Sequence, residues 1–387
     1  MAVLVVPISY LNDAIGRKKT IMIMIIPFTI GWILIIFAKS VYTFYVSRLF
    51  IGVTECLFIS LPMYIGEISS PNVRGMWGNA LAVSVNLGFL LINIIGTYNS
   101  LLVTAYICLG LCLVLLGISP FLTDTPYFYI IKNEEGKARK TLQYLYQSEE
   151  VEDLYKLIKS DVERQMSEKG TWMDIFSIKS NRRALIFGLF LRSSVALSGA
   201  VSLTAHGMEI FTDNGPLSPQ MSSIYLLSVV ISTSLVAAFT INKFGRKQSF
   251  SYSCLLASIS LFILTIYYWL EEFHPDLVVT LSWMPLFLLT IYAIFYVMGI
   301  GTIGILMMEE LFSASIKSKA LCLCTFANCI VSALVNEIFN VLNLTFGLYA
   351  MFLFFSISCA AMFVLSFWLV PETTGKTLEE IQQDLKK

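Results

Sequence analysis

The chain has 387 residues, of which 57% are hydrophobic and 13% are charged, and its 26 basic and 26 acidic residues cancel. A soluble protein carries about 25% charged residues, so this composition predicts a membrane protein. It gives nucleic-acid binding no electrostatic basis. The eight cysteines form no Cys-x-x-Cys pair and only two histidines accompany them, so we expect neither a metal site nor a cofactor.

Apolar segments follow one another in two blocks. The sequence predicts apolar helices, in chain order, at 1–11, 20–38, 41–64, 77–97 and 101–122, and then at 184–207, 219–241, 249–270, 279–307, 318–341 and 346–370. A helix needs about 20 residues to cross a bilayer, so the first segment is too short to span it. We therefore expect an all-α membrane protein with one helix bundle at 1–122 and a second at 184–370.

A polar segment, residues 123–183, separates the two predicted bundles. Its apolar residues recur at helical spacing, as they do in amphipathic helices in water. They are Leu142, Leu145, Tyr146, Leu154, Leu157 and Ile158. This pattern predicts a helical linker outside the membrane, and residues 371–387 form a polar tail.

Basic residues occur in alternate connections between the predicted helices. These connections hold Arg17-Lys18-Lys19, Arg74, the linker, Lys243 with Arg246 and Lys247, Lys317 with Lys319, and the tail. Because Lys and Arg concentrate in cytoplasmic loops, we expect the linker and the tail to lie in the cytosol. Residue 1 then falls within or beyond the bilayer, which indicates that the first helix and the outer part of the second are missing before it.

Three short motifs occur in the same order in both predicted bundles. They are Gly16-Arg17-Lys18 and Gly245-Arg246-Lys247; Glu67 with Arg74 and Glu310 with Lys317, each pair seven residues apart; and Thr123-Asp124-Thr125-Pro126 and Pro371-Glu372-Thr373-Thr374. Two parallel halves with a binding site between them are the layout of a transporter that rocks between two states.

With Arg48-Leu49-Phe50-Ile51-Gly52 and the segment 62–68, these motifs resemble the sugar porters of the major facilitator superfamily, and within that family the insect facilitated trehalose transporters. The resemblance runs from residue 1 to about 381. It implies a major facilitator fold and a plasma-membrane carrier that moves a sugar, a hexose or a trehalose-like one, down its gradient by alternating access. Neither a catalytic triad nor a P-loop points to an enzyme or an ATP-driven pump.

The resemblance also implies a cytosolic gate made of charge pairs that bridge the two halves. Charges near a membrane are costly and normally pair, which supports this interpretation. The candidates are Arg17, Arg48, Glu67, Arg74, Arg246, Glu310 and Lys317. The alternative is that such charges only anchor the topology at the cytosolic surface.

Four residues are candidates for contact with the solute: Asn86, Ser198, His206 and Asn328. Asn86 is the middle one of three asparagines, with Asn79 and Asn93, that repeat every seven residues and so share one helix face. That face meets either a cavity or another helix. For His206, solute contact and a hydrogen bond near the outer interface both remain open.

Several positions depart from the family's sugar pocket. Ala82 replaces a usual glutamine, Val195-Ala196 replaces a glutamine pair, and Cys329 replaces a tryptophan. Sugar recognition needs several hydrogen-bond partners and an aromatic face. The sequence therefore leaves open another small polar or anionic solute, or a protein that does not transport, either a sensor or a decayed paralogue. Arg192 either binds an anionic solute or extends to the cytosolic interface.

Overall fold

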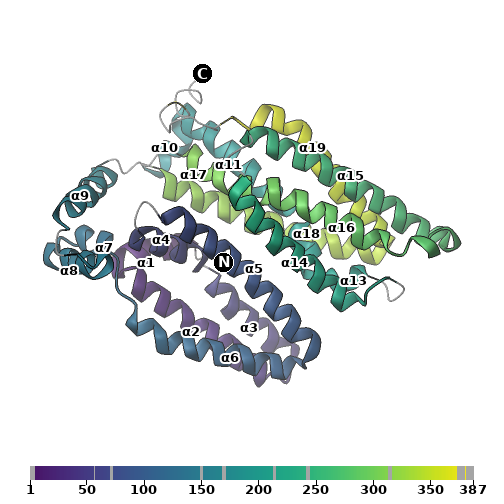
Figure 1. Cartoon of the computed structure of the whole chain (residues 1–387), viewed down its shortest axis with the longest axis horizontal. Helices are drawn as coiled ribbons and strands as arrows, with labels where there is room; N and C mark the ends of the chain where they lie inside the picture. Colours follow the sequence, from purple (N-terminus) through teal and green to yellow (C-terminus); the bar gives the residue numbers. More distant parts are fainter. Residues whose placement is uncertain are drawn as a thin grey trace. The chain divides into compact units, whose positions relative to one another are not determined.

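The computed structural model describes residues 5–55, 57–69, 73–148, 151–167, 171–211, 215–240, 245–312, 316–372 and 380. Within these residues every regular element is a helix, which confirms the all-α prediction (Figure 1). The chain divides into two compact units, Met1–Ser84 with Ile95–Gly170 and Val85–Ile94 with Thr171–Lys387. In the described part, eight helices are long and apolar enough to cross a membrane.

The first unit is built around α2. Its apolar helices are α1 (Val5–Ile15), α2 (Arg17–Ile36), α3 (Val41–Thr54), α4 (Leu57–Ile68), both ends of α5 (Arg74–Tyr98), whose residues 85–94 group with the second unit, and α6 (Leu101–Ile118). α2 packs against α1, α3, α4 and α6. The sequence predicts one helix at 41–64, whereas α3 ends at Thr54 and α4 begins at Leu57. Hydropathy does not detect this break because apolar residues continue on both sides of the exposed Glu55.

The linker forms a small helical cluster of its own. A short η2 (Ser119–Phe121) leads to α7 (Pro126–Ile131), α8 (Glu135–Tyr146) and α9 (Glu152–Ser167). Their shared core holds Ile130, Ala138, Leu142, Val151, Tyr155, Ile158 and Val162. Leu142 and Ile158 are buried, as the helical spacing predicts, but the side chain of Leu157 is 55% exposed. Leu157 lies one residue off the buried stripe, since its neighbour Ile158 occupies the core position.

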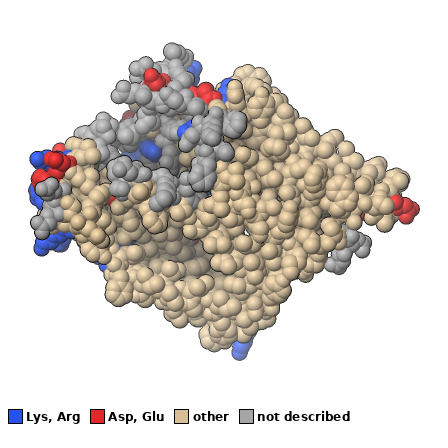
Figure 2. All heavy atoms as spheres, viewed as in Figure 1, with Lys and Arg blue, Asp and Glu red and all other residues tan. Residues whose placement is uncertain are grey.

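Charged side chains cover the outside of this cluster. Arg139 pairs with Glu135 at 3.2 Å and with Glu152 at 3.0 Å, and its guanidinium lies 4.2 Å from the centre of the Tyr155 ring. Lys159 pairs with Glu135 at 2.7 Å. Figure 2 shows these charges gathered over α8 and α9, while the visible face of the long helices is almost free of charge. Such exposed pairs add little stability, so the apolar core holds the linker together.

This core predicts how the linker responds to substitution. Replacing the fully buried Leu142 with alanine removes apolar contacts and leaves a cavity, at a cost of about 2–5 kcal/mol. We expect Leu142→Ala to speed proteolytic cleavage between α7 and α9 in the intact protein, because a loosened helix cluster exposes its backbone. Leu157→Ala is the matched control and should leave the cleavage rate unchanged. Equal rates for the two variants would contradict the assignment of the core.

The second unit contains the longest helices. In chain order it has α10 (Trp172–Ser177), α11 (Lys179–Leu197), α12 (Ala200–Ala205), α13 (Gly207–Ile210), α14 (Pro219–Thr240), α15 (Arg246–Phe273), η3 (Pro275–Leu277), η4 (Val279–Leu281), α16 (Met284–Tyr296), η5 (Val297–Gly301), α17 (Thr302–Leu311), α18 (Lys317–Phe346) and α19 (Leu348–Leu369). α15 runs beside α19 (Figure 1). Ser258 and Ser356 donate to each other's backbone carbonyls at 2.9 and 3.0 Å, which requires close helix packing.

Two of the predicted spans in this unit are irregular. The segment predicted as one helix at 184–207 is interrupted after Leu197, and Gly199 has a left-handed φ of 87° before α12 begins. The segment 279–307 contains a π-helical turn, η5, between α16 and α17. Composition does not reveal either feature, because both segments remain apolar throughout. Interrupted helices and π-turns in membrane proteins commonly mark binding sites.

Candidate functional site

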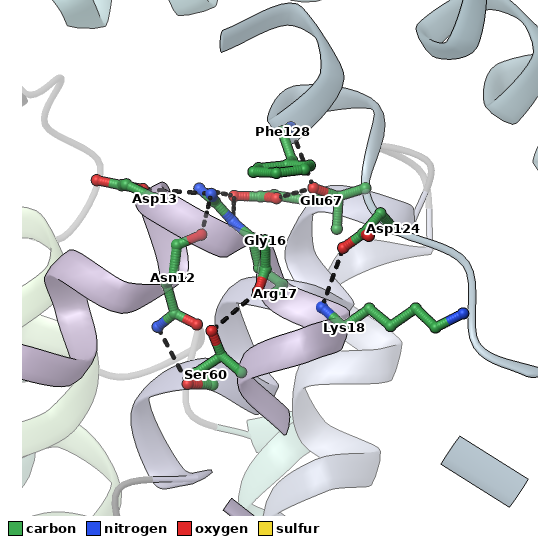
Figure 3. A network of polar contacts seen from close by, with 11 residues as sticks. Asn12, Asp13, Gly16, Arg17, Lys18, Ser60, Glu67, Asp124 and Phe128 are labelled. Atoms are coloured by element: carbon green, nitrogen blue, oxygen red, sulfur yellow. Dashed lines mark hydrogen bonds and ion pairs between the residues drawn. The ribbon is translucent and has the colours of Figure 1, made fainter. Parts of the chain in front are cut away.

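Arg17 is the centre of a polar network in the first unit. It opens α2, and its side chain is only 5% exposed. Nη2 lies 2.8 Å from Oε1 of Glu67, and Nη1 lies 3.2 Å from Oδ1 of Asp13 (Figure 3). Nη1 also donates to the backbone carbonyl of Asn12 at 3.0 Å. The buried guanidinium therefore has two carboxylates and a carbonyl as partners, as a desolvated charge requires.

Glu67 brings the linker into this network. Its Oε1 accepts a second bond from Nε of Arg17 at 3.1 Å, and its Oε2 accepts a short hydrogen bond from the Thr125 hydroxyl. Burial raises the pKa of Glu67, against the opposite effects of Arg17 and Thr125. Its carboxylate is thus easier to protonate than an exposed one, and protonation would leave Arg17 with Asp13 as its only carboxylate partner among the described residues.

A second contact fixes the start of α2 against the end of the first bundle. Oδ1 of Asp124 accepts a hydrogen bond from the backbone N–H of Lys18 at 3.2 Å, and Nζ of Lys18 donates to the carbonyl of Pro120 at 2.7 Å. Gly16 has a φ of 98°, and a Cβ there would lie 2.7 Å from Oδ1 of Asp124. Asp124 therefore caps the positive end of α2 from a remote position, which only glycine at residue 16 permits.

The second unit repeats this arrangement. The carboxylate of Glu372 accepts hydrogen bonds from the backbone N–H groups of Arg246 at 3.1 Å and Lys247 at 3.3 Å, at the start of α15. Nζ of Lys247 donates to the carbonyl of Phe367 at 2.8 Å, just before α19 ends. In each unit the last motif thus caps the helix that the first motif begins. The repeat seen in the sequence is therefore a repeat of one structural joint.

The remaining gate candidates are placed less completely. Arg48 is exposed on α3, and Lys317 is half-buried at the start of α18. The side chains of Arg74 and Glu310 lie outside the described part of the structure. Of the seven candidates, the structure pairs Arg17 with Glu67 inside the first unit, and a gating role for the set stays a prediction.

Ser198 lies at the helix interruption of the second unit. Its hydroxyl donates to the carbonyl of Val195 at 2.8 Å, and its own carbonyl accepts a hydrogen bond from the Tyr292 hydroxyl at 2.9 Å. Gly199 follows, and a Cβ at this position would lie 2.7 Å from the ring of the fully buried Phe355. The interruption is thus held by α16 and α19.

Two of the other solute candidates, His206 and Asn328, lie close to this interruption, because α12 follows α11 directly and α18 packs against both helices. His206 ends α12 and stacks on Phe339 of α18, with ring centroids 4.3 Å apart. Asn328, also on α18, has a buried Oδ1 without a hydrogen-bond partner among the described residues. Asn86 lies in the segment 85–94, which groups with the second unit, and its Nδ2 is 3.5 Å from Oγ of Ser234.

Sequence reasoning missed two polar residues in this region. The Ser202 hydroxyl donates to Oδ1 of Asn336 at 2.6 Å and joins α12 to α18. Both lie in largely apolar helices, and no motif points to them. The one sequence pattern that could have identified Asn336 is its spacing from Asn328. Asn336 follows Asn328 by about two helical turns and so lies near the same face of α18.

Two all-helical units that repeat one capped joint fit the major facilitator fold, and the comparisons with known proteins give the family. The sequence profile described as "Sugar (and other) transporter" matches residues 5–385, and the chain belongs to this family of multi-pass membrane transporters. It is 30% identical to a facilitated trehalose transporter of Apis mellifera ligustica over 379 residues, which cover 96% of this chain and 74% of that protein. A Bombyx mori facilitated trehalose transporter is 29% identical, over 97% of this chain and 75% of that protein.

Solved structures show the same fold. The inward-open xylose transporter XylE from E. coli superposes with a TM-score of 0.81 at 17% identity, over 99% of this chain and 86% of that chain. XylE bound to 6-bromo-6-deoxy-D-glucose superposes with a TM-score of 0.75 at 19% identity, over 97% of this chain and 85% of that chain. At these identities the likeness concerns the fold alone.

Proposed function

We propose that the protein is a sugar carrier of the plasma membrane, which moves a hexose or a trehalose-like sugar by alternating access. The observation that carries this proposal is the duplicated joint, in which Asp124 caps α2 and Glu372 caps α15. Because the same cap holds the start of α2 in one bundle and of α15 in the other, each bundle can move as a rigid body during alternating access. Family membership and the named substrates of the relatives support a sugar as the solute.

The proposed gate uses the buried pair of the first unit. Arg17 and Glu67 hold α2 and α4 together at the end of the bundle that the basic loops assign to the cytosol. Arg48, Arg74, Arg246, Glu310 and Lys317 are the further gate residues of the proposal. A change of state then requires charge pairs at this surface to separate and form again, at a cost that the solute's preference for one state offsets.

The proposed solute contacts are Asn86, Ser198, His206 and Asn328. Asn328 supports this assignment best, because a buried acceptor without a partner in the described structure is costly and a solute hydroxyl would satisfy it. The Ser198 hydroxyl already donates within its own helix, so its role is to shape the interruption and to accept a bond there.

The orientation gives a testable prediction. A cysteine introduced at the exposed Gln143 in α8 is expected to react with an impermeant thiol reagent only after the cells are opened, because the linker faces the cytosol. A cysteine at the exposed Asn99, in the opposite set of connections, is expected to react in intact cells. Labelling of the unmodified chain gives the background from its native cysteines, which is subtracted. Strong labelling of position 143 in intact cells would overturn the proposed topology.

Transport itself is tested by uptake in cells that lack their own sugar carriers. Cells that express this chain are expected to take up labelled trehalose or glucose with a rate that saturates, and the unlabelled sugar should compete. A carrier gives flux that saturates, whereas a sensor binds the sugar without flux. Binding with uptake equal to that of cells without the chain would refute the carrier assignment.

A further inference from the structure

Arg192 lies at the centre of a membrane-length helical segment of the second unit. The segment runs from Lys179 to Ala205, so Arg192 is 13 residues from each end. At a rise of 1.5 Å per residue the distance to Lys179 along α11 is about 20 Å, and even Arg183 is about 13 Å away along the axis. An arginine side chain is shorter than either distance. Arg192 therefore does not extend to an interface, and its charge stays inside the unit.

Among the described residues, the surroundings of Arg192 offer it no opposite charge. Its Nε is buried and has no hydrogen-bond partner in this part of the chain. The titratable groups close enough to interact electrostatically with Arg192 are Tyr296, Cys324 and Cys329 in this part of the chain, and none of them is a carboxylate. Arg17 provides the comparison within the same protein, since its buried guanidinium has two carboxylates and a carbonyl as partners.

A guanidinium without a carboxylate partner inside a membrane helix is costly, and such residues usually mark the path of a solute or ion. Several features meet around Arg192. Val195 and Ala196 lie one turn further along α11, on the same side of the helix, and Ser198–Gly199 interrupts the helix just beyond them. On α18, which packs against α11, Asn328 adds a buried acceptor without a partner in the described structure. The second unit thus contains a positively charged donor, Arg192, and an amide acceptor, Asn328, that a ligand could satisfy.

We propose that Arg192 is the anion-binding group of the solute site and that the transported solute is an acidic sugar, with hydroxyl groups and a single oxyanion. Arginine binds carboxylate or phosphate oxygens through two parallel N–H bonds, which fixes both position and orientation. The Asn328 amide then accepts a bond from a sugar hydroxyl. The inference rests on the proposed carrier function and assigns to the solute an acidic group that glucose and trehalose lack.

Uptake of four labelled sugars by the purified full chain in liposomes tests this inference. The probes are glucuronate, glucose 6-phosphate, glucose and trehalose. We expect one of the two acidic sugars to have the highest initial uptake rate per unit concentration. The preferred acid then identifies the oxyanion as carboxylate or phosphate. Uptake of glucose or trehalose with no uptake of either acid would overturn the inference and leave the carrier function intact. No flux of any of the four sugars would refute the carrier function as well.

Variants at residue 192 separate charge recognition from folding. Arg192→Gln is expected to lower uptake of the acidic sugar about 10- to 100-fold, the effect of losing a hydrogen bond to a charged group, and to lower uptake of the neutral sugars far less. Arg192→Lys keeps the charge and should retain part of the acid uptake. An equal loss of acidic and neutral sugar uptake in the glutamine variant, with the lysine variant no better, would show that Arg192 serves only the fold and would contradict the inference.

Discussion

Replacing Arg17 with methionine is expected to destabilise the protein by about 3–5 kcal/mol, because the buried Glu67 would lose its cation and would then either stay charged without a partner or have to be protonated. The side chains of Arg17 and Glu67 are 5% and 13% exposed, so water compensates for little of the loss. Thermal unfolding of the purified protein in detergent measures the change. A second substitution, Glu67→Gln, removes the stranded charge and should restore part of the stability.

Arg139→Met is the matched control for this prediction. Arg139 also pairs with two carboxylates, but on the exposed surface of the linker, where such pairs contribute little. Its replacement should leave the unfolding temperature nearly unchanged. If Arg17→Met and Arg139→Met changed the unfolding temperature equally little, the pair between Arg17 and Glu67 would contribute no more to stability than an exposed surface pair.

Replacing Gly199 with alanine is expected to have the second large effect. Residue 199 adopts a φ of 87°, which costs a residue with a Cβ about 1–2 kcal/mol. The new Cβ would also lie 2.7 Å from the ring of Phe355, which is fully buried and has no room to move. Overpacking of this kind costs about 1–3 kcal/mol more. We expect loss of both thermal stability and sugar uptake, since the interruption of α11 lies in the candidate solute site.

Gly117→Ala controls for the change of residue type. Gly117 lies in α6, where a Cβ added to it would meet no neighbouring heavy atom within 4 Å, and its helical backbone accepts alanine readily. This variant should match or exceed the stability of the unmodified protein. Gly199→Ala with unchanged stability and uptake would show that the left-handed turn is not needed.

The joints between motifs were predictable in outline because charged residues stand out in an apolar chain. The repeat of Gly16-Arg17-Lys18 and Gly245-Arg246-Lys247 predicted two equivalent halves, and the structure gives both the same carboxylate cap. The sequence did not show that Asp124 and Glu372 are those caps. A contact across more than 100 residues leaves no local pattern.

The irregular parts of the helices could not be predicted for a different reason. Hydropathy measures transfer into an apolar environment and is blind to the backbone, so it merged α3 with α4 and joined α11 to α12. The interruption at Gly199 depends on the space left by Phe355, which is a tertiary effect. The sequence placed Arg192 within a predicted span and left open whether it extends to the interface, and its distance from the start of the helical segment excluded that alternative.

Counterflow in liposomes tests most directly the claim that this chain is a secondary carrier. Liposomes that contain the purified full chain are loaded with an unlabelled sugar and diluted into a trace of the labelled sugar. A carrier that alternates between two states returns faster when loaded, so the label should accumulate transiently above its equilibrium level before it falls again. Label that only binds, or that enters at the same rate with empty and loaded liposomes, would contradict the account.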